Sequence, residues 1–398
     1  MALAVVGAVA AFLAVWVVLH HGFYTHRQIV DTPVYVTYGN EIAQGKVPYR
    51  DFAVEYPPAA LPVFAIPSVG HAPSSFVTYR RIFETLMWLC GALTLLAAAG
   101  ALAGLGAGAR RTAAALGFAA LVPLALGSVI LSRFDLWPTL FCVAGLAALV
   151  RDRSRVGLGL LGFAIAAKLW PGVVAPVALA YVWRRHGRRE ALVSLGILLG
   201  VVAAWFVPFV LVSPSGVWHS LSGQLTRPLQ IESLGSSLLL AAHQAFGLGI
   251  TMVSSHGSQN LDGSLATGVG IVQSLVQIAV LVGLWAAFAR RPEPSGEDLV
   301  RFSAAAVCAF IALGKVLSPQ FLIWLLPLVP LVGGRRGVRA AALLAVACVL
   351  TQLWFPFRYW DLVAFKALPS WLLLARDLAL VALLAVLAGP ALRVRDAD

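Results

Sequence analysis

Acidic residues and cysteines are scarce in this chain. Of 398 residues, 17 are Asp or Glu, against 29 Lys or Arg, and four are Cys. Cys90, Cys142, Cys308 and Cys348 lie within apolar runs, with neither a metal-ligand spacing nor a disulfide framework. This pattern excludes a disulfide-rich scaffold and a cysteine-ligated zinc domain. We expect the four thiols to be small, buried apolar groups.

Several catalytic motifs are also missing. The sequence has no GxxxxGK(S/T) phosphate loop, no GxGxxG after a strand and no GxSxG elbow, so nucleotide-driven and serine-hydrolase chemistry have no support. His20, His21 and His26 match no zinc motif. We therefore predict no cofactor and no metal, with a loosely held divalent cation near Asp31 and Glu55 as the open alternative.

Long hydrophobic runs fill most of the chain. Hydrophobic residues make up 60%, and the mean hydropathy is +0.87, which excludes an ordinary soluble domain. The runs are apolar all round, unlike the alternating strands of a membrane β-barrel. We predict an all-α polytopic membrane protein of about twelve transmembrane helices. They are expected near 2–20, 76–104, 113–131, 136–150, 156–168, 170–183, 190–212, 268–289, 300–314, 319–333, 338–356 and 371–389. The first run has no basic segment before it and no clear cleavage site, so it is expected to be a retained span.

Two kinds of connector alternate between these runs. One kind is rich in arginine and should face the cytoplasm, which explains the net charge of +12 better than nucleic-acid binding does. These connectors are Arg110-Arg111, 151–155, 184–189, Arg290-Arg291, 335–339 and Arg393 with Arg395. The other kind has mixed charge and should face outward. Its two long members are residues 21–75 and 213–267, within a single membrane domain spanning 1–398.

Two apolar stretches do not fit the alternation. Residues 57–70 contain four prolines and are short for a span, so a helix at the outer interface or a re-entrant segment is expected. Residues 234–250 are a second candidate of this kind.

The first outer loop concentrates carboxylates in a chain that has few, which indicates chemistry or ligand binding. Asp31 is placed to cap a helix, and a capping Asp can also be catalytic. Asp51 and Glu55 are each a candidate second acid or an ionic partner that holds the loop against an arginine. Asp361 and Asp377, further along, are expected to be interface charges.

Basic residues recur at the outer ends of the spans. Arg133, Lys168, Arg227 and Lys315 are each interpretable as an anchor that reaches the lipid headgroups. Together they would suit an anionic lipid phosphate. Nearby prolines indicate helix starts, whose free N–H groups also favour an anion. These prolines are Pro138, Pro171, Pro228 and Pro319.

The order of these fragments resembles the polyprenyl-phosphate-dependent GT-C glycosyltransferases, and most closely glycosyltransferase family 87, the group of mycobacterial mannosyl- and arabinosyltransferases. The first outer loop carries the likeness through Asp31, Tyr35, Gly45, Pro48-Tyr49, Asp51-Phe52 and Glu55-Tyr56-Pro57-Pro58. Further matches are Arg133-Phe134-Asp135, Lys168-Leu169-Trp170-Pro171, Gln230-Ile231-Glu232-Ser233 and Ser318-Pro319-Gln320, followed by Trp324 and Pro327.

The resemblance implies an integral membrane enzyme with a catalytic Asp in the first outer loop, matched by Asp31. We expect it to move one sugar, mannose first and arabinose next, from a polyprenyl-phosphate donor to a lipid- or polysaccharide-linked acceptor. Transfer is expected to be inverting, at the outer face of the cell membrane, with Asp31 as general base. The expected phosphate ligands are Arg227, Lys168, Arg133 and Lys315. The expected substrate-binding residues are Asp51, Glu55, Tyr56, Asp135, Trp170, Glu232 and Gln320.

A transporter or flippase for a lipid-linked or glycan substrate is the main alternative, and a non-catalytic scaffold is another. Transporters place polar groups near the bilayer midplane and often show inverted repeats. Here the ionisable residues gather at one face and no repeat is visible, which favours chemistry on one side of the membrane.

Overall fold

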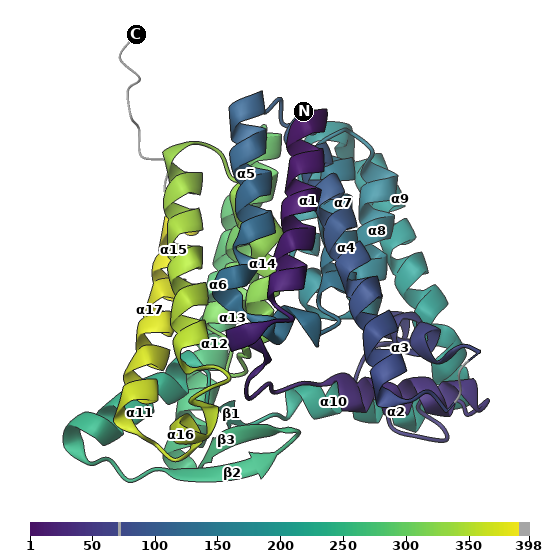
Figure 1. Ribbon diagram of the computed structural model, residues 1–398. Helices are drawn as coiled ribbons and strands as arrows, with labels where there is room; N and C mark the ends of the chain where they lie inside the picture. The colour runs from purple at the N-terminus through teal and green to yellow at the C-terminus, as the bar shows by residue number, and fades with distance from the viewer. Residues whose placement is uncertain (71–72, 390–398) are drawn as a thin grey trace.

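The structure is a computed structural model that describes residues 1–70 and 73–389. Its long helices run side by side between two ends (Figure 1). They are α1 (Ala2–Val18), α4 (Phe76–Gly104), α5 (Ala109–Leu121), α7 (Leu136–Leu149), α8 (Ser154–Ala167), α9 (Ala175–Val212), α12 (Ser264–Ala289), α13 (Gly296–Ala312), α15 (Gly334–Trp354) and α17 (Ala367–Ala388). Two short helices lie in the same bundle, α6 (Pro123–Leu126) and α14 (Leu322–Leu328). Residues 21–70, 73–75 and 213–267 gather at one end, which we call the loop end (Figure 1).

The loop end has its own short elements. They are α2 (Thr32–Ala43), α3 (Leu61–Ala65), α10 (Pro214–Leu225), α11 (Leu234–Phe246), α16 (Tyr359–Val363), β1 (Leu229–Gln230), β2 (Thr251–Ser255) and β3 (Ser258–Asp262).

The all-α membrane fold predicted from the sequence is confirmed. Each of the twelve predicted spans coincides with a helical segment in the described chain. Six of the described helical segments are long and apolar enough to cross a membrane. Others are shorter because prolines divide them, as in 319–333, where α14 lies between two 3₁₀ turns. The predicted spans 170–183 and 190–212 correspond to the two parts of α9 on either side of Gly187, where the backbone leaves the helical conformation with a φ of 82°.

Arginine clusters meet at the end opposite the loop end, and we call it the arginine end. It holds Arg110-Arg111, 151–155, 184–189, Arg290-Arg291 and 335–339. Contacts between the clusters support this: Arg111 bonds Glu297 at the start of α13, and Arg184 bonds the Ala289 carbonyl at the end of α12. Arg393 and Arg395, predicted to belong here, lie outside the described residues.

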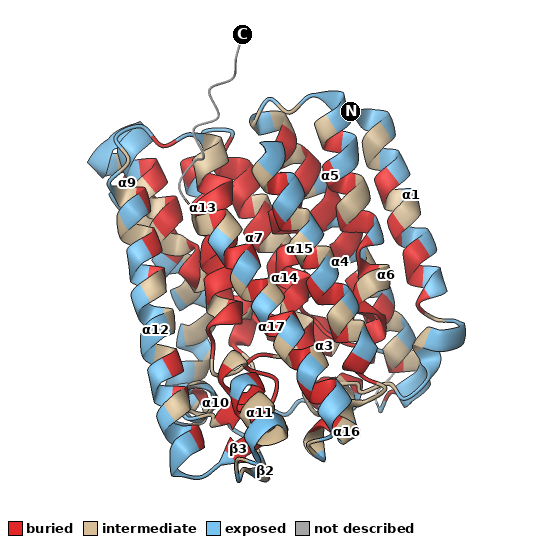
Figure 2. Cartoon of the chain, turned by 90° about the vertical axis from the view of Figure 1, so that its left-hand side faces the viewer, coloured by how far each residue is buried: buried red, intermediate tan, exposed pale blue. Residues whose placement is uncertain are grey.

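The protein core lies in the middle of the bundle, and exposed residues follow the outer surfaces of helices such as α1 and α12 (Figure 2). Glycines let two of the core helices approach closely. A Cβ on Gly145 of α7 would lie 2.9 Å from the Gly157 carbonyl of α8, so only small residues fit this crossing. The exposed leucines and valines of α12 fit a helix that faces lipid.

The loop end differs from expectation in containing strands. Residues 213–267 were expected to be a loop with one helix, but they include an antiparallel sheet in the order β1-β3-β2. A two-residue turn joins β2 to β3, with both His256 and Gly257 at positive φ, the geometry that matches the twist of a hairpin. The expected helix in 234–250 is α11, which ends at Gly247 in the left-handed region.

The proline-rich segment 57–70 is helical over Pro58–Ser68 and includes α3. It is a buried element of the protein: Ala59, Ala60 and Phe64 are fully buried. The Trp137 indole donates a hydrogen bond to the Ala59 carbonyl. Irregular backbone at this depth is stable because protein, not lipid, surrounds it.

Candidate active site at the loop end

A buried ion pair stands at the junction of α7, α8 and α14. Asp135, directly before α7, is fully buried, and its Oδ1 lies 2.7 Å from Lys168 Nζ at the end of α8. The same oxygen accepts a hydrogen bond from the Trp324 indole at 2.5 Å. The other oxygen, Oδ2, is buried and has no hydrogen-bond partner in the described chain. Asp135 is therefore fixed by its neighbours and is poorly placed to exchange protons with a substrate.

Aromatic rings surround the Lys168 ammonium. It lies 4.6 Å from the centre of the Phe134 ring and 5.5 Å from that of Trp324, which is cation–π distance. Trp324 in turn stacks on Trp170 with ring centres 4.8 Å apart and planes 7° apart. One wall of the site is therefore formed by four packed side chains, those of Phe134, Lys168, Trp170 and Trp324.

Asp31 pairs with Arg133 across 102 residues of sequence. Asp31 occupies the N-cap position of α2, as the capping alternative required, but its side chain makes no capping hydrogen bond. The Arg133 side chain is 6% exposed, and its Nη2 also donates to the Ile29 carbonyl, whereas Asp31 is 30% exposed. Burial lowers the pKa of Arg133 to about 10, and the nearby carboxylates of Asp135 and Glu232 oppose that shift.

Glu232 is the second buried carboxylate of the site. It follows β1, is 2% exposed, and accepts a hydrogen bond from the Gln230 side chain at 2.8 Å. Burial raises its pKa to about 8, although the positive charges of Arg376, Arg133 and Arg227 act in the opposite direction. A buried carboxyl with this pKa can hold a proton near neutral pH.

Arg376 and Asp377 were not expected in the site. Asp377 was predicted to be an interface charge, and this is wrong: both side chains are fully buried, with Nε and Oδ1 2.7 Å apart. Arg376 also donates to the main-chain carbonyl of Glu232 at 2.7 Å, which ties α17 to the loop end. The sequence signal was an Arg-Asp pair inside an apolar run, where charge persists only if it is paired. Asp361 differs from Asp377, since its side chain is 41% exposed and pairs with Lys366.

The hairpin holds Arg227 beside the first outer loop. Its Nη2 donates to the His256 carbonyl at 3.1 Å and to Ser258 Oγ at 3.2 Å. Its Nε is buried without a hydrogen-bond partner in the described chain. Burial lowers the pKa of Arg227, whereas the neighbouring Glu55, Tyr56 and Glu232 raise it. The predicted residues Glu55 and Tyr56 therefore lie near Arg227, and the Gln224 side chain donates a hydrogen bond to the Glu55 carbonyl.

Tyr56 also belongs to an aromatic group beneath the loop. Its ring packs edge-on against Phe134, with centres 4.8 Å apart, and against Tyr35 of α2. Burial raises the pKa of Tyr56, so its hydroxyl stays protonated and can donate a hydrogen bond. These rings connect the Asp31 helix to the Arg133 and Asp135 turn.

The remaining predicted residues are placed differently. The Lys315 carbonyl accepts a hydrogen bond from the Gln230 amide, which brings residues 315–320 beside β1. Gln320 accepts a hydrogen bond from Ser318. Asp51 stands apart in an exposed turn, bonded to its neighbour Arg50 and to the Val47 amide. We call Asp31, Arg133, Asp135, Lys168, Arg227 and Glu232 the charged cluster.

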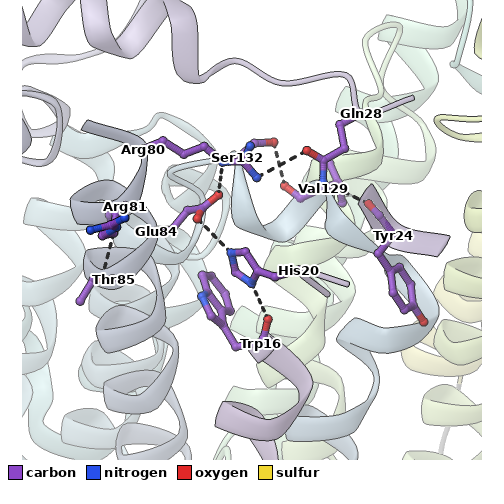
Figure 3. Close-up of polar contacts among 10 residues, drawn as sticks. All are labelled: Trp16, His20, Tyr24, Gln28, Arg80, Arg81, Glu84, Thr85, Val129 and Ser132. Atoms are coloured by element: carbon purple, nitrogen blue, oxygen red, sulfur yellow. Dashed lines mark hydrogen bonds and ion pairs between the residues drawn. The ribbon is translucent and has the colours of Figure 1, made fainter. Parts of the chain in front are cut away.

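A separate polar network anchors the segment that leads to Asp31 (Figure 3). His20, considered above as a metal ligand, bonds Glu84 of α4 at 2.9 Å and the Trp16 carbonyl at 2.7 Å. Arg80 bonds the other Glu84 oxygen at 2.7 Å and reaches Gln28 at 3.5 Å. The network fixes both ends of residues 20–28 and so limits where Asp31 can move.

Comparison with known proteins identifies the family. The model of glycosyltransferase family 87 matches residues 54–319, about two thirds of the chain. No curated protein sequence matches. Among solved structures, ArnT from Cupriavidus metallidurans bound to undecaprenyl phosphate is similar at 17% identity and a TM-score of 0.51, over 96% of this chain and 76% of that one. An Archaeoglobus fulgidus oligosaccharyltransferase in the apo form gives 13% identity and a TM-score of 0.47, over 97% of this chain and 55% of that one.

The family match covers Glu55, Arg133, Asp135, Lys168, Arg227 and Glu232 and ends just before Gln320, whereas Asp31 precedes it. The match places the protein among glycosyltransferases and not among transporters or flippases. The chain belongs to glycosyltransferase family 87 and is a multi-pass membrane glycosyltransferase with the GT-C fold of the polyprenyl-phosphate-dependent enzymes.

Proposed function

We propose that the protein transfers a single sugar from a polyprenyl-phosphate donor to a lipid- or polysaccharide-linked acceptor at the loop end. Mannose is the favoured sugar and arabinose the next. The arginine clusters at the opposite end support a loop end that faces the periplasm or the exterior. The support for one-sided chemistry is the charged cluster, which gathers three cations and three carboxylates within a fold otherwise poor in charge.

The donor phosphate would lie among Arg133, Lys168 and Arg227, with Lys315 beside them. As the bond to the sugar breaks, negative charge grows on the phosphate, and fixed cations in a partly buried site stabilise it. Arg227 Nε has no hydrogen-bond partner in the described residues, so it is free to bind an added anion. Arg133 and Arg227 are also planar donors suited to two phosphate oxygens at once.

Exposure is the observation that favours Asp31 as general base. Asp31 is 30% exposed, whereas Asp135 and Glu232 are at most 2% exposed. Asp135 is bound by Lys168 and Trp324, and Glu232 by Gln230. Asp31 is thus the carboxylate of the charged cluster that an incoming hydroxyl can reach. It would take the hydroxyl proton as the oxygen attacks the anomeric carbon, with polyprenyl phosphate leaving from the opposite face.

This role requires the Asp31–Arg133 pair to open. A donor phosphate competes for Arg133, and once it has bound, the Asp31 carboxylate loses its partner and can accept a proton. The donor would therefore bind before the acceptor reacts. Until then, the Asp31 carboxylate stays in its ion pair with Arg133.

The other substrate contacts follow from position. Glu55 and Tyr56 lie beside Arg227 and would meet the sugar near its phosphate. Glu232 would orient Arg227 or bind a sugar hydroxyl. Asp135 and Trp170 would act through Lys168 and Trp324, because both are buried behind them. Asp51 and Gln320 would contact the acceptor.

The test is transfer by Asp31→Asn, in a single-turnover reaction with a synthetic polyprenyl-phosphate sugar. We expect a loss of about 10²–10⁴-fold, the usual contribution of a general base. Asp361→Asn is the matched control, since it makes the same change in an exposed ion pair at the same end. Near-normal turnover by Asp31→Asn would refute the assignment, and equal losses in both variants would show a nonspecific effect.

A further inference from the structure

The bend in α9 creates a groove at the arginine end, far from the charged cluster. Gly187 reverses the chain, and the groove is lined by residues four and eight positions before it, Trp183 and Leu179, and four and eight positions after it, Ala191 and Leu195. This spacing shows that the two parts of α9 lie antiparallel against each other. The groove encloses about 480 Å³, within the range of roughly 300–1,000 Å³ that is usual for ligand sites.

The groove wall is apolar and opens toward the membrane. Trp183 is 51% exposed and Leu192 is 52% exposed, and most of residues 192–212 are exposed or half-buried. Such a surface is covered by hydrocarbon in a bilayer. Trp183 stands next to the arginines of the turn, the depth at which indole rings gather at the membrane interface.

The turn at Gly187, between the two parts of α9 that line the groove, carries exposed positive charge. Arg184 closes one side by donating two hydrogen bonds to the Ala289 carbonyl of α12. Arg188 and Arg189 are exposed and form no ion pair in the described part of the chain. The nearby carboxylates form ion pairs with other residues: Asp152 with Arg185 and His186, and Glu190 with Arg155.

We propose that this groove binds an anionic phospholipid of the leaflet at the arginine end. Arg188 and Arg189 would hold its phosphate, and Trp183, Leu192 and Leu195 would contact the start of an acyl chain. Basic pockets between membrane helices are suited to anionic headgroups. The lining covers about one turn on each part of α9, roughly 6 Å, which fits the glycerol end of a phospholipid better than a long prenyl chain.

The test measures lipid retention by native mass spectrometry. Purified protein in an uncharged detergent is mixed with vesicles of phosphatidylglycerol, phosphatidylcholine or polyprenyl phosphate. We expect phosphatidylglycerol to be retained above the other two. The double variant Arg188→Gln/Arg189→Gln should weaken that retention about 30-fold, because each basic residue near an anionic surface contributes roughly a factor of five.

A matched control removes two exposed arginines at the same end and away from the groove, Arg335→Gln/Arg339→Gln, and should retain the lipid. A second variant, Trp183→Ala, keeps every charge and should reduce retention while preserving the preference for phosphatidylglycerol. Equal retention of phosphatidylglycerol and phosphatidylcholine, equal losses in both double variants, or preferred retention of polyprenyl phosphate would each overturn the proposal. The outcome is independent of whether sugar transfer is observed.

Discussion

Asp135→Asn tests the energetic role of the buried Asp135–Lys168 pair. At 2.7 Å and an effective dielectric constant near 20, the two charges attract by about 6 kcal/mol, offset by the cost of burying both. Asn keeps an oxygen that accepts from Trp324, so the substitution removes charge with little change of shape. It leaves the Lys168 ammonium buried without a counter-charge. We expect a loss of about 3–5 kcal/mol, the usual cost of breaking a buried pair from one side.

The assay is thermal unfolding in detergent, followed with a thiol-reactive fluorescent dye. The four cysteines are all buried, so the dye reacts only when the bundle opens. The Asp135→Asn midpoint should fall by several degrees. The double variant Asp135→Asn/Lys168→Met should recover part of the loss, because no unpaired charge then stays buried.

An unchanged midpoint for Asp135→Asn would refute this reasoning. Strict additivity would also refute it. If the double variant lost as much stability as Asp135→Asn and Lys168→Met lose together when measured singly, the two charges would not be coupled. Asp361→Asn provides the matched control, because its pair with Lys366 is exposed to solvent and is expected to contribute little to stability.

Two further predictions concern the cations and the buried acid. Arg227→Ala should raise the KM for donor more than the KM for acceptor in steady-state assays, because the proposed contact is with the donor phosphate; equal changes would argue against that contact. Glu232→Gln should flatten the pH dependence of stability. Burial raises the pKa of Glu232 from 4.5 to about 8, so the folded state favours the protonated form. Wild-type stability should therefore fall by up to roughly 5 kcal/mol as pH rises from about 4.5 to 8. A Glu232→Gln protein with the same fall in denaturation experiments would contradict the assigned pKa.

Hydropathy predicted the positions of the spans because the bilayer strongly restricts which backbone structures can cross it. A chain in lipid must satisfy its backbone within helices, so long apolar runs leave few alternatives. The two parts of α9 illustrate this. Each was predicted as a separate span, and they meet at Gly187. The clusters of arginines that mark the connectors also meet at one end, as the alternation requires.

The short strands of the loop end escaped prediction for a local reason. β2 and β3 are five residues each, and their sequences, TMVSS and SQNLD, lack a clear apolar alternation. The only strong signal was the His256-Gly257 turn, since a Gly at the second turn position favours a tight hairpin. The sheet depends on packing against α11 and α12, which a local pattern does not report.

The sequence predicted which residues belong to the charged cluster, but it did not predict which of them form ion pairs with each other. The sequence indicates that Asp31, Arg133, Lys168 and Arg227 matter, yet nothing in it pairs Asp31 with Arg133 or Asp135 with Lys168. Those pairs depend on how α2, α7 and α8 pack. Asp51 shows the converse, since it lies in the same loop as Asp31 but bonds to its neighbour Arg50 instead of to the cluster.

The most direct test of the central claim is transfer by purified protein from radiolabelled polyprenyl-phosphate-mannose and polyprenyl-phosphate-arabinose, with Asp31→Asn in parallel. The account predicts labelled product from one donor, mannose first, and a loss of about 10²–10⁴-fold in the variant. Product that forms equally well with Asp31→Asn, or no product from either donor with folded protein and a broad acceptor mixture, would contradict it.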